Sequence, residues 1–283
     1  MSMDSLAPFF FTSEYALYFQ KSSITKHAHN KHKDTHKNKN QLSTVDTIAR
    51  LCNKDRQWLK SCKHPQRRNN FLRSRRMLCE LFYPYAPRRL DNGYVYINPY
   101  HCVSITYKKD LVIVGRTTAF PAHQGLFFGV DIEKRHVSDR LSKRLLSEIV
   151  RPYDMAVLCR HASQASQASQ GEPQALYNFL GALAFSGKEA IHKALGRYGM
   201  EKYALHYELY FVRSHKTHRY RLYEQEWLCT FKYKNKGHII SSKLPLYLYL
   251  KVYPFSQAGS SYILSILYQH HHKHPYGFLG KKK

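Results

Sequence analysis

Helix-forming and strand-forming segments follow one another twice, in the same order, along the 283-residue chain. Residues 65–82 place apolar side chains at helical spacing, and residues 173–195 do so more strongly, with apolar residues at i, i+3, i+4 and i+7. Runs rich in β-branched and aromatic residues, typical of strands, follow each helix. These runs are 93–97, 102–107, 111–117 and 126–133, and then 204–212, 226–233, 246–252 and 261–268. The sequence therefore predicts an α+β fold with two similar halves, each combining a helix with antiparallel strands.

The composition indicates a globular protein, because 43% of the residues are hydrophobic and 14% are aromatic, enough for one large core or two small ones. The six cysteines are scattered without a C-x-x-C pair, so neither a disulfide framework nor a zinc knuckle is indicated, and a reducing cytosol fits best. No run approaches the roughly 20 apolar residues of a membrane span, and residues 1–23 lack the basic start of a signal peptide. We therefore expect a cytoplasmic protein that does not associate with membranes.

Polar segments interrupt these patterns. Residues 21–42 are rich in Lys, His and Asn and predict a solvated linker, the repeat at 163–170 predicts a surface loop, and 269–283 predicts a basic tail. Histidines of the linker and tail are candidates for transition-metal capture, but a basic segment is the preferred interpretation. A helix is expected at about 138–149.

The formal net charge of +26, from 45 basic and 19 acidic residues, points to an anionic partner. A nucleic acid, a membrane surface, a phosphorylated cofactor and an acidic protein all meet that description. Charge alone does not choose among them.

Two acids follow an apolar run at Asp131 and Glu133. If 126–133 is a strand, both carboxylates project from one face, while Val130 and Ile132 point into the core from the other. Neighbouring carboxylates repel each other unless a cation lies between them, and Mg²⁺ is the usual ion for paired acid oxygens. Taken alone, the pair fits solvated surface acids better.

A second candidate group lies on the predicted helix at 173–195. Glu189 and Lys193 are four residues apart and share a face distinct from the leucine stripe, with Lys188 beside them. An acid and a base would then face the same side. On spacing alone, an ordinary i, i+4 ion pair is the simpler interpretation.

Together, the two segments resemble a known family. The stretches "GVDIE" (129–133) and "FSGKEAIHKAL" (185–195) are similar to the paired signature of the 4'-phosphopantetheinyl transferase superfamily, G-[IV]-D-x-E followed by F-S-x-K-E-[AS]-x-x-K-[AL]. The gap between them is longer than usual for the family, and the repeat at 163–170 accounts for the excess. Residues 67–75 and 103–115 resemble an arginine-bearing helix and a strand pair of such enzymes.

The resemblance implies the two-lobed enterobactin-synthase-component or surfactin type, which serves siderophore, non-ribosomal peptide or polyketide synthesis. It implies a monomer with the cofactor in a cleft between two pseudo-symmetric lobes, each with a small antiparallel sheet and a packed helix. Asp131 and Glu133 would come from the first lobe, and Glu189 and Lys193 from the second. The expected segments are an N-terminal segment at 1–43, lobes at 44–158 and 174–268, a loop at 159–173 and a tail at 269–283.

The resemblance also implies a reaction. Such an enzyme moves the 4'-phosphopantetheine arm of coenzyme A onto a serine of an acidic apo acyl or peptidyl carrier protein and releases adenosine 3',5'-bisphosphate. Asp131, Glu133 and Glu189 would hold Mg²⁺ against the diphosphate. Lys193 would contact the phosphates, and Lys188 would add positive charge. Glu189 is one candidate for the base that takes the serine proton, which the sequence leaves open.

Further coenzyme A contacts are implied in the first lobe. Arg67, Arg68 and Arg75 are candidates for the 3'-phosphate, although the spacing of Arg75 also suits the core stripe. Ser104 opens a strand motif, S-[IM]-[ST]-H, in which Tyr107 replaces the family histidine. A neutral phenol donates a hydrogen bond but brings no positive charge to a phosphate.

Two alternatives stay open. The charge and the 23 tyrosines also suit a nucleic-acid-binding protein, although the sequence contains no RNP1, zinc-finger or helix-turn-helix signature. The replacement at Tyr107 also fits a catalytically weakened relative of the transferases.

Overall fold

The computed structural model contains two compact units, Met1–Ala122 and His123–Lys283. The structure describes residues 10–11, 15–21, 44–90, 94–97, 101–108, 111–117, 126–134, 150, 152–154, 156–157, 160, 173–196, 198–214, 227–234, 245–257 and 260–270. Apart from their first residues, the expected linker and basic tail lie outside these ranges, as do the repeat loop and the helix expected at 138–149. The described part is mixed helix and strand with antiparallel sheets, which confirms the predicted α+β class.

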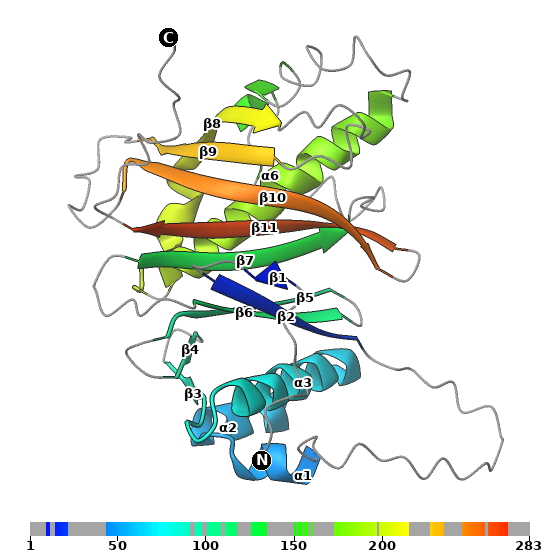
Figure 1. Ribbon diagram of the computed structural model, residues 1–283, viewed down its shortest axis with the longest axis vertical. Helices are drawn as coiled ribbons and strands as arrows, with labels where there is room; N and C mark the ends of the chain where they lie inside the picture. The colour runs from blue at the N-terminus through cyan, green and yellow to red at the C-terminus, as the bar shows by residue number, and fades with distance from the viewer. Residues whose placement is uncertain are drawn as a thin grey trace, which may run out of the picture. The chain divides into compact units, whose positions relative to one another are not determined.

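The first unit is built on a four-stranded antiparallel sheet in the order β1-β2-β6-β5 (Figure 1). Its strands are β1 (Phe10–Phe11), β2 (Tyr15–Lys21), β5 (Val103–Lys108) and β6 (Leu111–Thr117). The bounds of β6 are those predicted from the sequence. In contrast, β2 was expected to belong to an N-terminal segment outside the lobes, and the structure pairs it with β6 along its whole length.

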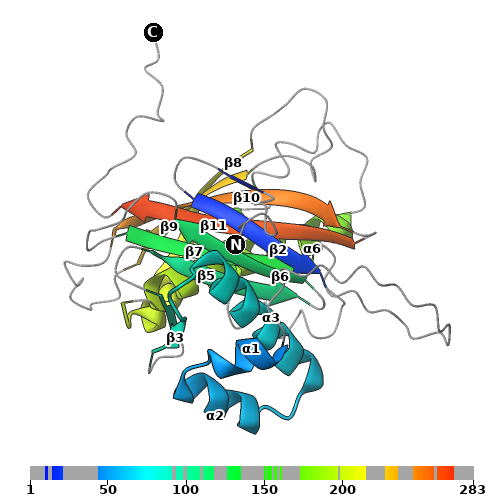
Figure 2. The same ribbon diagram turned by 60° about the horizontal axis from the view of Figure 1, so that its bottom comes forward.

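Among the described residues of the first unit, three helices and a short β-ribbon accompany this sheet (Figure 2). They are α1 (Thr44–Ala49), α2 (Asn53–Ser61), α3 (Pro65–Leu81), β3 (Arg88–Arg89) and β4 (Val95–Tyr96). Pro65 favours the start of α3, since its fixed φ suits the first helical position, and the His64 side chain accepts a hydrogen bond from the Arg67 N–H. Met77 and Leu78 of α3 join Val112 and Val114 of β6 in one hydrophobic core.

The second unit is a five-stranded antiparallel sheet in the order β7-β11-β10-β9-β8, with one long helix, α6 (Pro173–Gly196), across one face (Figure 1). The strands are β7 (Leu126–Lys134), β8 (Tyr207–Ser214), β9 (Trp227–Tyr233), β10 (Tyr247–Gln257) and β11 (Ser260–His270). The 3-10 helix η1 (Glu201–His206) precedes β8. The expected strand at 204–212 is therefore wrong at its start, because residues 204–206 close a helical turn.

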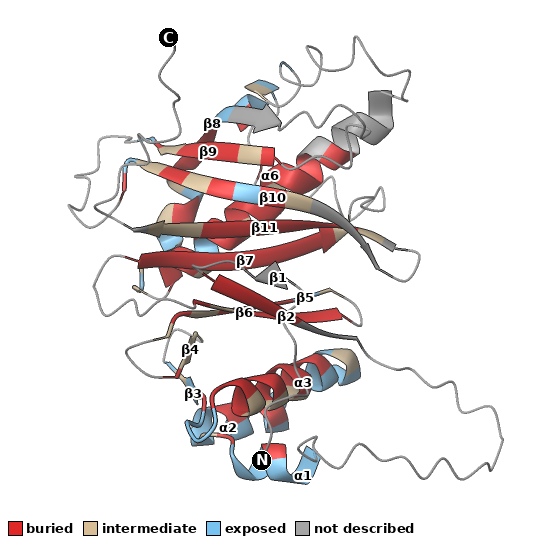
Figure 3. Cartoon of the chain, viewed as in Figure 1, coloured by how far each residue is buried: buried red, intermediate tan, exposed pale blue. Residues whose placement is uncertain are grey.

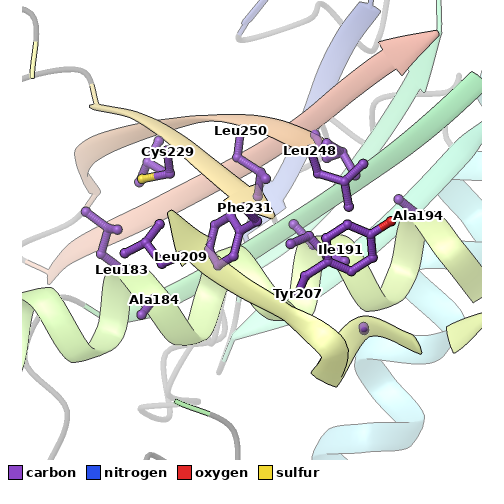
Figure 4. Close-up of a cluster of buried hydrophobic side chains, with 14 of the residues drawn as sticks. Leu183, Ala184, Ile191, Ala194, Tyr207, Leu209, Cys229, Phe231, Leu248 and Leu250 are labelled. Carbon is purple, nitrogen blue, oxygen red and sulfur yellow. The ribbon is translucent and has the colours of Figure 1, made fainter. Parts of the chain in front are cut away.

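The core of the second unit lies between α6 and the sheet (Figure 4). Leu183 and Ile191 of α6 pack with Tyr207, Phe231 and Leu250 of the strands, and all five are fully buried. Burial raises the pKa of the Cys229 thiol to about 12, so this cysteine is a neutral core residue. None of the described helices is long and apolar enough to cross a membrane.

The pairing of β7 corrects one expectation about the lobes. β7 lies at one edge of the second sheet and pairs with β11 from Leu126 to Lys134. Asp131 and Glu133 therefore belong to the same unit as Glu189 and Lys193, not to a separate first lobe. The expectation followed the order of the segments in the sequence, whereas β7 forms its strand pairing with β11, which comes much later in the chain.

Candidate active site

Strand β7 presents its two acids to the face of the sheet that α6 covers. Phe127 belongs to the core beneath α6, and Gly129 contacts the α6 backbone, so alternate residues of the strand face the helix. Asp131 and Glu133 continue this series and are only 5% and 8% exposed. Almost all of β7 is drawn in the colour of buried residues (Figure 3). This burial excludes the interpretation of the two acids as solvated surface residues.

Gly129 allows α6 and β7 to approach closely. A Cβ atom built at this position would lie 2.0 Å from the Ala190 carbonyl oxygen and 2.9 Å from the Ala194 backbone nitrogen. No side chain larger than hydrogen fits between the two backbones without a shift. The glycine of "GVDIE" therefore places the helix against the strand, two residues from Asp131.

Lys193 of α6 binds Asp131 of β7. Its Nζ donates hydrogen bonds to Asp131 Oδ1 at 2.6 Å and to the Val130 carbonyl oxygen at 3.2 Å. The lysine side chain is 21% exposed and the aspartate 7%, so the ammonium lies at the edge of the buried acids. Two residues that are 62 positions apart, one from each motif, are thus in direct contact. Glu189, one helical turn before Lys193, is partly buried.

Two serines of β11 and α6 carry buried hydroxyl groups. Ser265 of β11 is directly opposite Asp131 in the strand register, and Ser186 of α6 lies one turn before Ala190. Both are completely buried, and within the described part of the chain neither Oγ atom has a hydrogen-bond partner. Sequence reasoning did not select either residue. The available signal for Ser265 was a single serine inside the otherwise apolar run "YILSILY".

Oxygen donors of this kind suit Mg²⁺. Carboxylates and hydroxyls are hard ligands, and Mg²⁺ is usually bound by one or two protein carboxylates while water and substrate phosphates complete its shell. Asp131 and Glu133, with the buried Ser265 hydroxyl opposite, fit such a site. The expected cluster of three acids is not assembled, since in the described ranges no three His, Cys, Asp or Glu side chains gather closely enough to hold a metal.

Lys188 lies in a different environment from the one expected. It is fully buried, and its Nζ is 2.5 Å from Asp154 Oδ2. Asp154 Oδ1 in turn accepts a hydrogen bond of 2.7 Å from the Leu209 backbone N–H. Lys188 and Asp154 therefore connect α6 to β8, and the ammonium is engaged inside the core of the second unit.

The arginines expected to bind a phosphate divide into two kinds. Arg75 is buried and forms a bidentate ion pair with Asp55, with distances of 2.7 Å and 3.1 Å, and it lies over the Phe71 ring. It helps to hold α3 against α2. Arg67 and Arg68 are exposed in the first turn of α3, where the positive end of the helix dipole also favours an anion.

Ser104 and Tyr107 lie on opposite faces of β5. Ser104 is buried, whereas Tyr107 is 46% exposed. Their sequence separation of three places them on alternate faces of a strand. One face of β5 thus cannot present both residues to the same phosphate.

Comparisons with known proteins do not assign a family. A search against models of protein families finds no match to this chain, and a search of curated proteins finds no significant match. Function is therefore inferred from the chemistry of the β7–α6 site and from the sequence motifs that form it.

Proposed function

We propose that this protein is a 4'-phosphopantetheinyl transferase, which moves the phosphopantetheine arm of coenzyme A onto a serine of an apo carrier protein. The observation that carries the proposal is the 2.6 Å contact between Lys193 and Asp131. It joins the two segments that resemble the paired signature of these enzymes. The Lys193 ammonium thus lies against one of the two buried carboxylates of β7, although the two residues are far apart in the sequence.

In this proposal, the two buried acids of β7 bind a divalent cation. Asp131 and Glu133 would bind Mg²⁺, which supplies Lewis-acid stabilisation of the diphosphate when it is bound. Because both carboxylates lie in a region of low dielectric, their attraction for a cation is stronger than on a water-exposed surface. Their position on one strand fixes the spacing between them.

Lys193 has two roles in the proposed reaction. In the free protein its ammonium compensates the charge of Asp131. In the complex with coenzyme A, the same flexible and partly exposed side chain would donate hydrogen bonds to a phosphate oxygen. The group that balances the acid thereby also contacts the substrate.

Glu189 is the proposed general base. It would accept the proton of the carrier serine while the serine oxygen bonds to the phosphorus that carries the pantetheine arm. The bond from that phosphorus to the bridging oxygen breaks, and adenosine 3',5'-bisphosphate leaves with the electron pair. Glu189 shares a face of α6 with Lys193, as an i, i+4 pair, so both would approach the same substrate group.

Residues of the first unit have a smaller place in the proposal. Arg67 and Arg68 are exposed and are the arginines proposed to bind the 3'-phosphate. Arg75 and Lys188 are assigned to ion pairs of the core. The two-lobed form, the acidic carrier and a siderophore, peptide or polyketide pathway remain parts of the proposal. The charge of +26 would speed the encounter with an acidic carrier.

The test is transfer of a fluorescent arm from labelled coenzyme A to an apo carrier protein in the presence of Mg²⁺. Asp131→Asn should lower the rate at least about 100-fold, as removal of a key electrostatic group in an active site commonly does. Asp46→Asn, which removes an exposed acid from α1, serves as the matched control and should leave the rate unchanged. Equal rates for both variants would contradict the proposal.

A further inference from the structure

Ser265 is a polar residue at a buried position of β11 whose neighbours on the same face are apolar core residues. It lies in β11 with 0% of its surface exposed, between Ile263 and Leu267, which both belong to the core under α6. Its Oγ atom has no hydrogen-bond partner in the described part of the chain. Buried hydroxyls are nearly always satisfied in native proteins, because an unsatisfied one lowers stability.

The register of the sheet sets the surroundings of this hydroxyl. Ser265 pairs directly with Asp131, while Ile263 pairs with Glu133 and Leu267 with Gly129. Residues directly opposite in antiparallel strands have Cβ atoms about 4.5–5.5 Å apart on the same face. The Ser265 side chain therefore starts next to that of Asp131, on the side of the sheet that faces α6.

We infer that Ser265 supplies its hydroxyl oxygen to the cation site, as a ligand beside Asp131. A neutral hydroxyl adds an oxygen donor without adding a third negative charge to two buried carboxylates. Hard cations such as Mg²⁺ and Mn²⁺ accept such oxygens. A cation would satisfy the hydroxyl, which explains a serine in this position. The inference rests on the proposed function for the presence of a cation, but not for the transfer reaction.

The experiment measures Mn²⁺ binding by electron paramagnetic resonance, with the full chain, with and without coenzyme A. Ser265→Ala should weaken Mn²⁺ binding by about 10- to 100-fold, the usual effect of losing a group that supports a metal. Thr230→Val is the matched control, since it removes a buried hydroxyl from β9, two strands away from β11. It should bind Mn²⁺ as the wild type does.

A second variant separates a ligand from a structural hydroxyl. Ser265→Cys replaces a hard oxygen by a soft sulfur in a similar volume, and it should raise the ratio of Cd²⁺ to Mn²⁺ affinity at least about 10-fold. The wild type, with its six native cysteines, gives the background for Cd²⁺. Melting temperatures in EDTA check folding, and Ser265→Ala should be at least as stable as the wild type there.

The outcomes distinguish the two proposals. Weaker Mn²⁺ binding by Ser265→Ala, together with the Cd²⁺ shift in Ser265→Cys, supports the assignment. Wild-type Mn²⁺ affinity in Ser265→Ala overturns the role of Ser265 and leaves the proposed transferase intact. If the wild type binds no Mn²⁺ even with coenzyme A present, the cation site and the proposed function both fail.

Discussion

Replacing Gly129 by alanine should disrupt the contact between β7 and α6. The added Cβ would lie 2.0 Å from the Ala190 carbonyl oxygen, whereas real Cβ atoms essentially never come within 3.0 Å of such an atom. The strand and helix must therefore separate by at least the difference, 3.0 − 2.0 = 1.0 Å. The obstacle is backbone, so no side chain can rotate away.

The size of the effect follows from the costs of overpacking. Forcing extra atoms into a packed core typically costs 1–3 kcal/mol, and a clash with backbone belongs at the upper end, at about 3 kcal/mol. For a domain of roughly 150–250 residues, each kcal/mol lowers the melting temperature by about 2–4 °C. Gly129→Ala should therefore melt about 6–12 °C below the wild type.

The assay is differential scanning calorimetry of wild type, Gly129→Ala and a matched control, Gly187→Ala. The control adds a methyl to the same helix–sheet interface, but there the nearest atom, at 3.0 Å, is at the tip of the Phe231 ring. Alanine also improves helix propensity by about 0.8–1.0 kcal/mol, so Gly187→Ala should be nearly neutral. If Gly129→Ala melts no lower than Gly187→Ala, the close approach of strand and helix is refuted.

Three further predictions concern charged and titratable side chains. Lys188→Met leaves Asp154 as an uncompensated buried charge and should lower the free energy of unfolding, measured by urea titration, by about 3–5 kcal/mol. Adding Asp154→Asn to this variant should recover part of the lost stability. A double variant as unstable as Lys188→Met would argue against the ion pair. Lys193→Met removes the ammonium that compensates the β7 acids and would compete with Mg²⁺ for them. In a thermal shift assay, Mg²⁺ should therefore raise the melting temperature of this variant more than that of the wild type. An equal rise would count against this competition. Partial burial and the nearby Arg116 lower the pKa of His101 below its ordinary value of 6.5, so the stability gained from its neutral form is lost as pH falls below that value. His101→Gln should therefore flatten the fall in melting temperature as the pH drops below about 6.5, and an unchanged slope would exclude this histidine as a source.

Local patterns predicted most of the elements, because hydrophobic periodicity survives in the sequence. The helices expected at 65–82 and 173–195 and the strand at 111–117 agree with the structure to within one residue at each end. The start of β8 was missed because the chain closes a turn after Gly199, whose φ is 68°, before it extends. Apolar character alone did not distinguish that turn from strand.

The sequence patterns did not predict which strands pair when the partners are far apart in the chain. β2 was not expected in a sheet, because its partner β6 lies far along the chain. The same limit explains why Asp131 and Glu133 were placed in the wrong half, since only the pairing with β11 assigns them. Their common face was predictable, because it follows from the two-residue period of any strand.

Buried ionic side chains were also beyond the sequence patterns. Lys and Arg are mostly exposed in proteins, and the sequence gives no sign of which acid will meet them in the core. Lys188 pairs with Asp154 and Arg75 with Asp55, in each case across different elements. The family resemblance implied a phosphate role for both basic residues, although the spacing of Arg75 also suited the core stripe. Only the structure shows the acid with which each one pairs.

The most direct measurement is the intact mass of an apo acyl or peptidyl carrier protein after incubation with this protein, coenzyme A and Mg²⁺. We expect a gain of one phosphopantetheine group on the carrier serine, abolished by EDTA and by Asp131→Ala. A carrier of unchanged mass under conditions in which the protein is folded and binds coenzyme A, with a panel of carriers of both kinds, would contradict the proposed transfer. Binding of single-stranded DNA that weakens with salt and is unaffected by Asp131→Ala would then favour the nucleic-acid alternative.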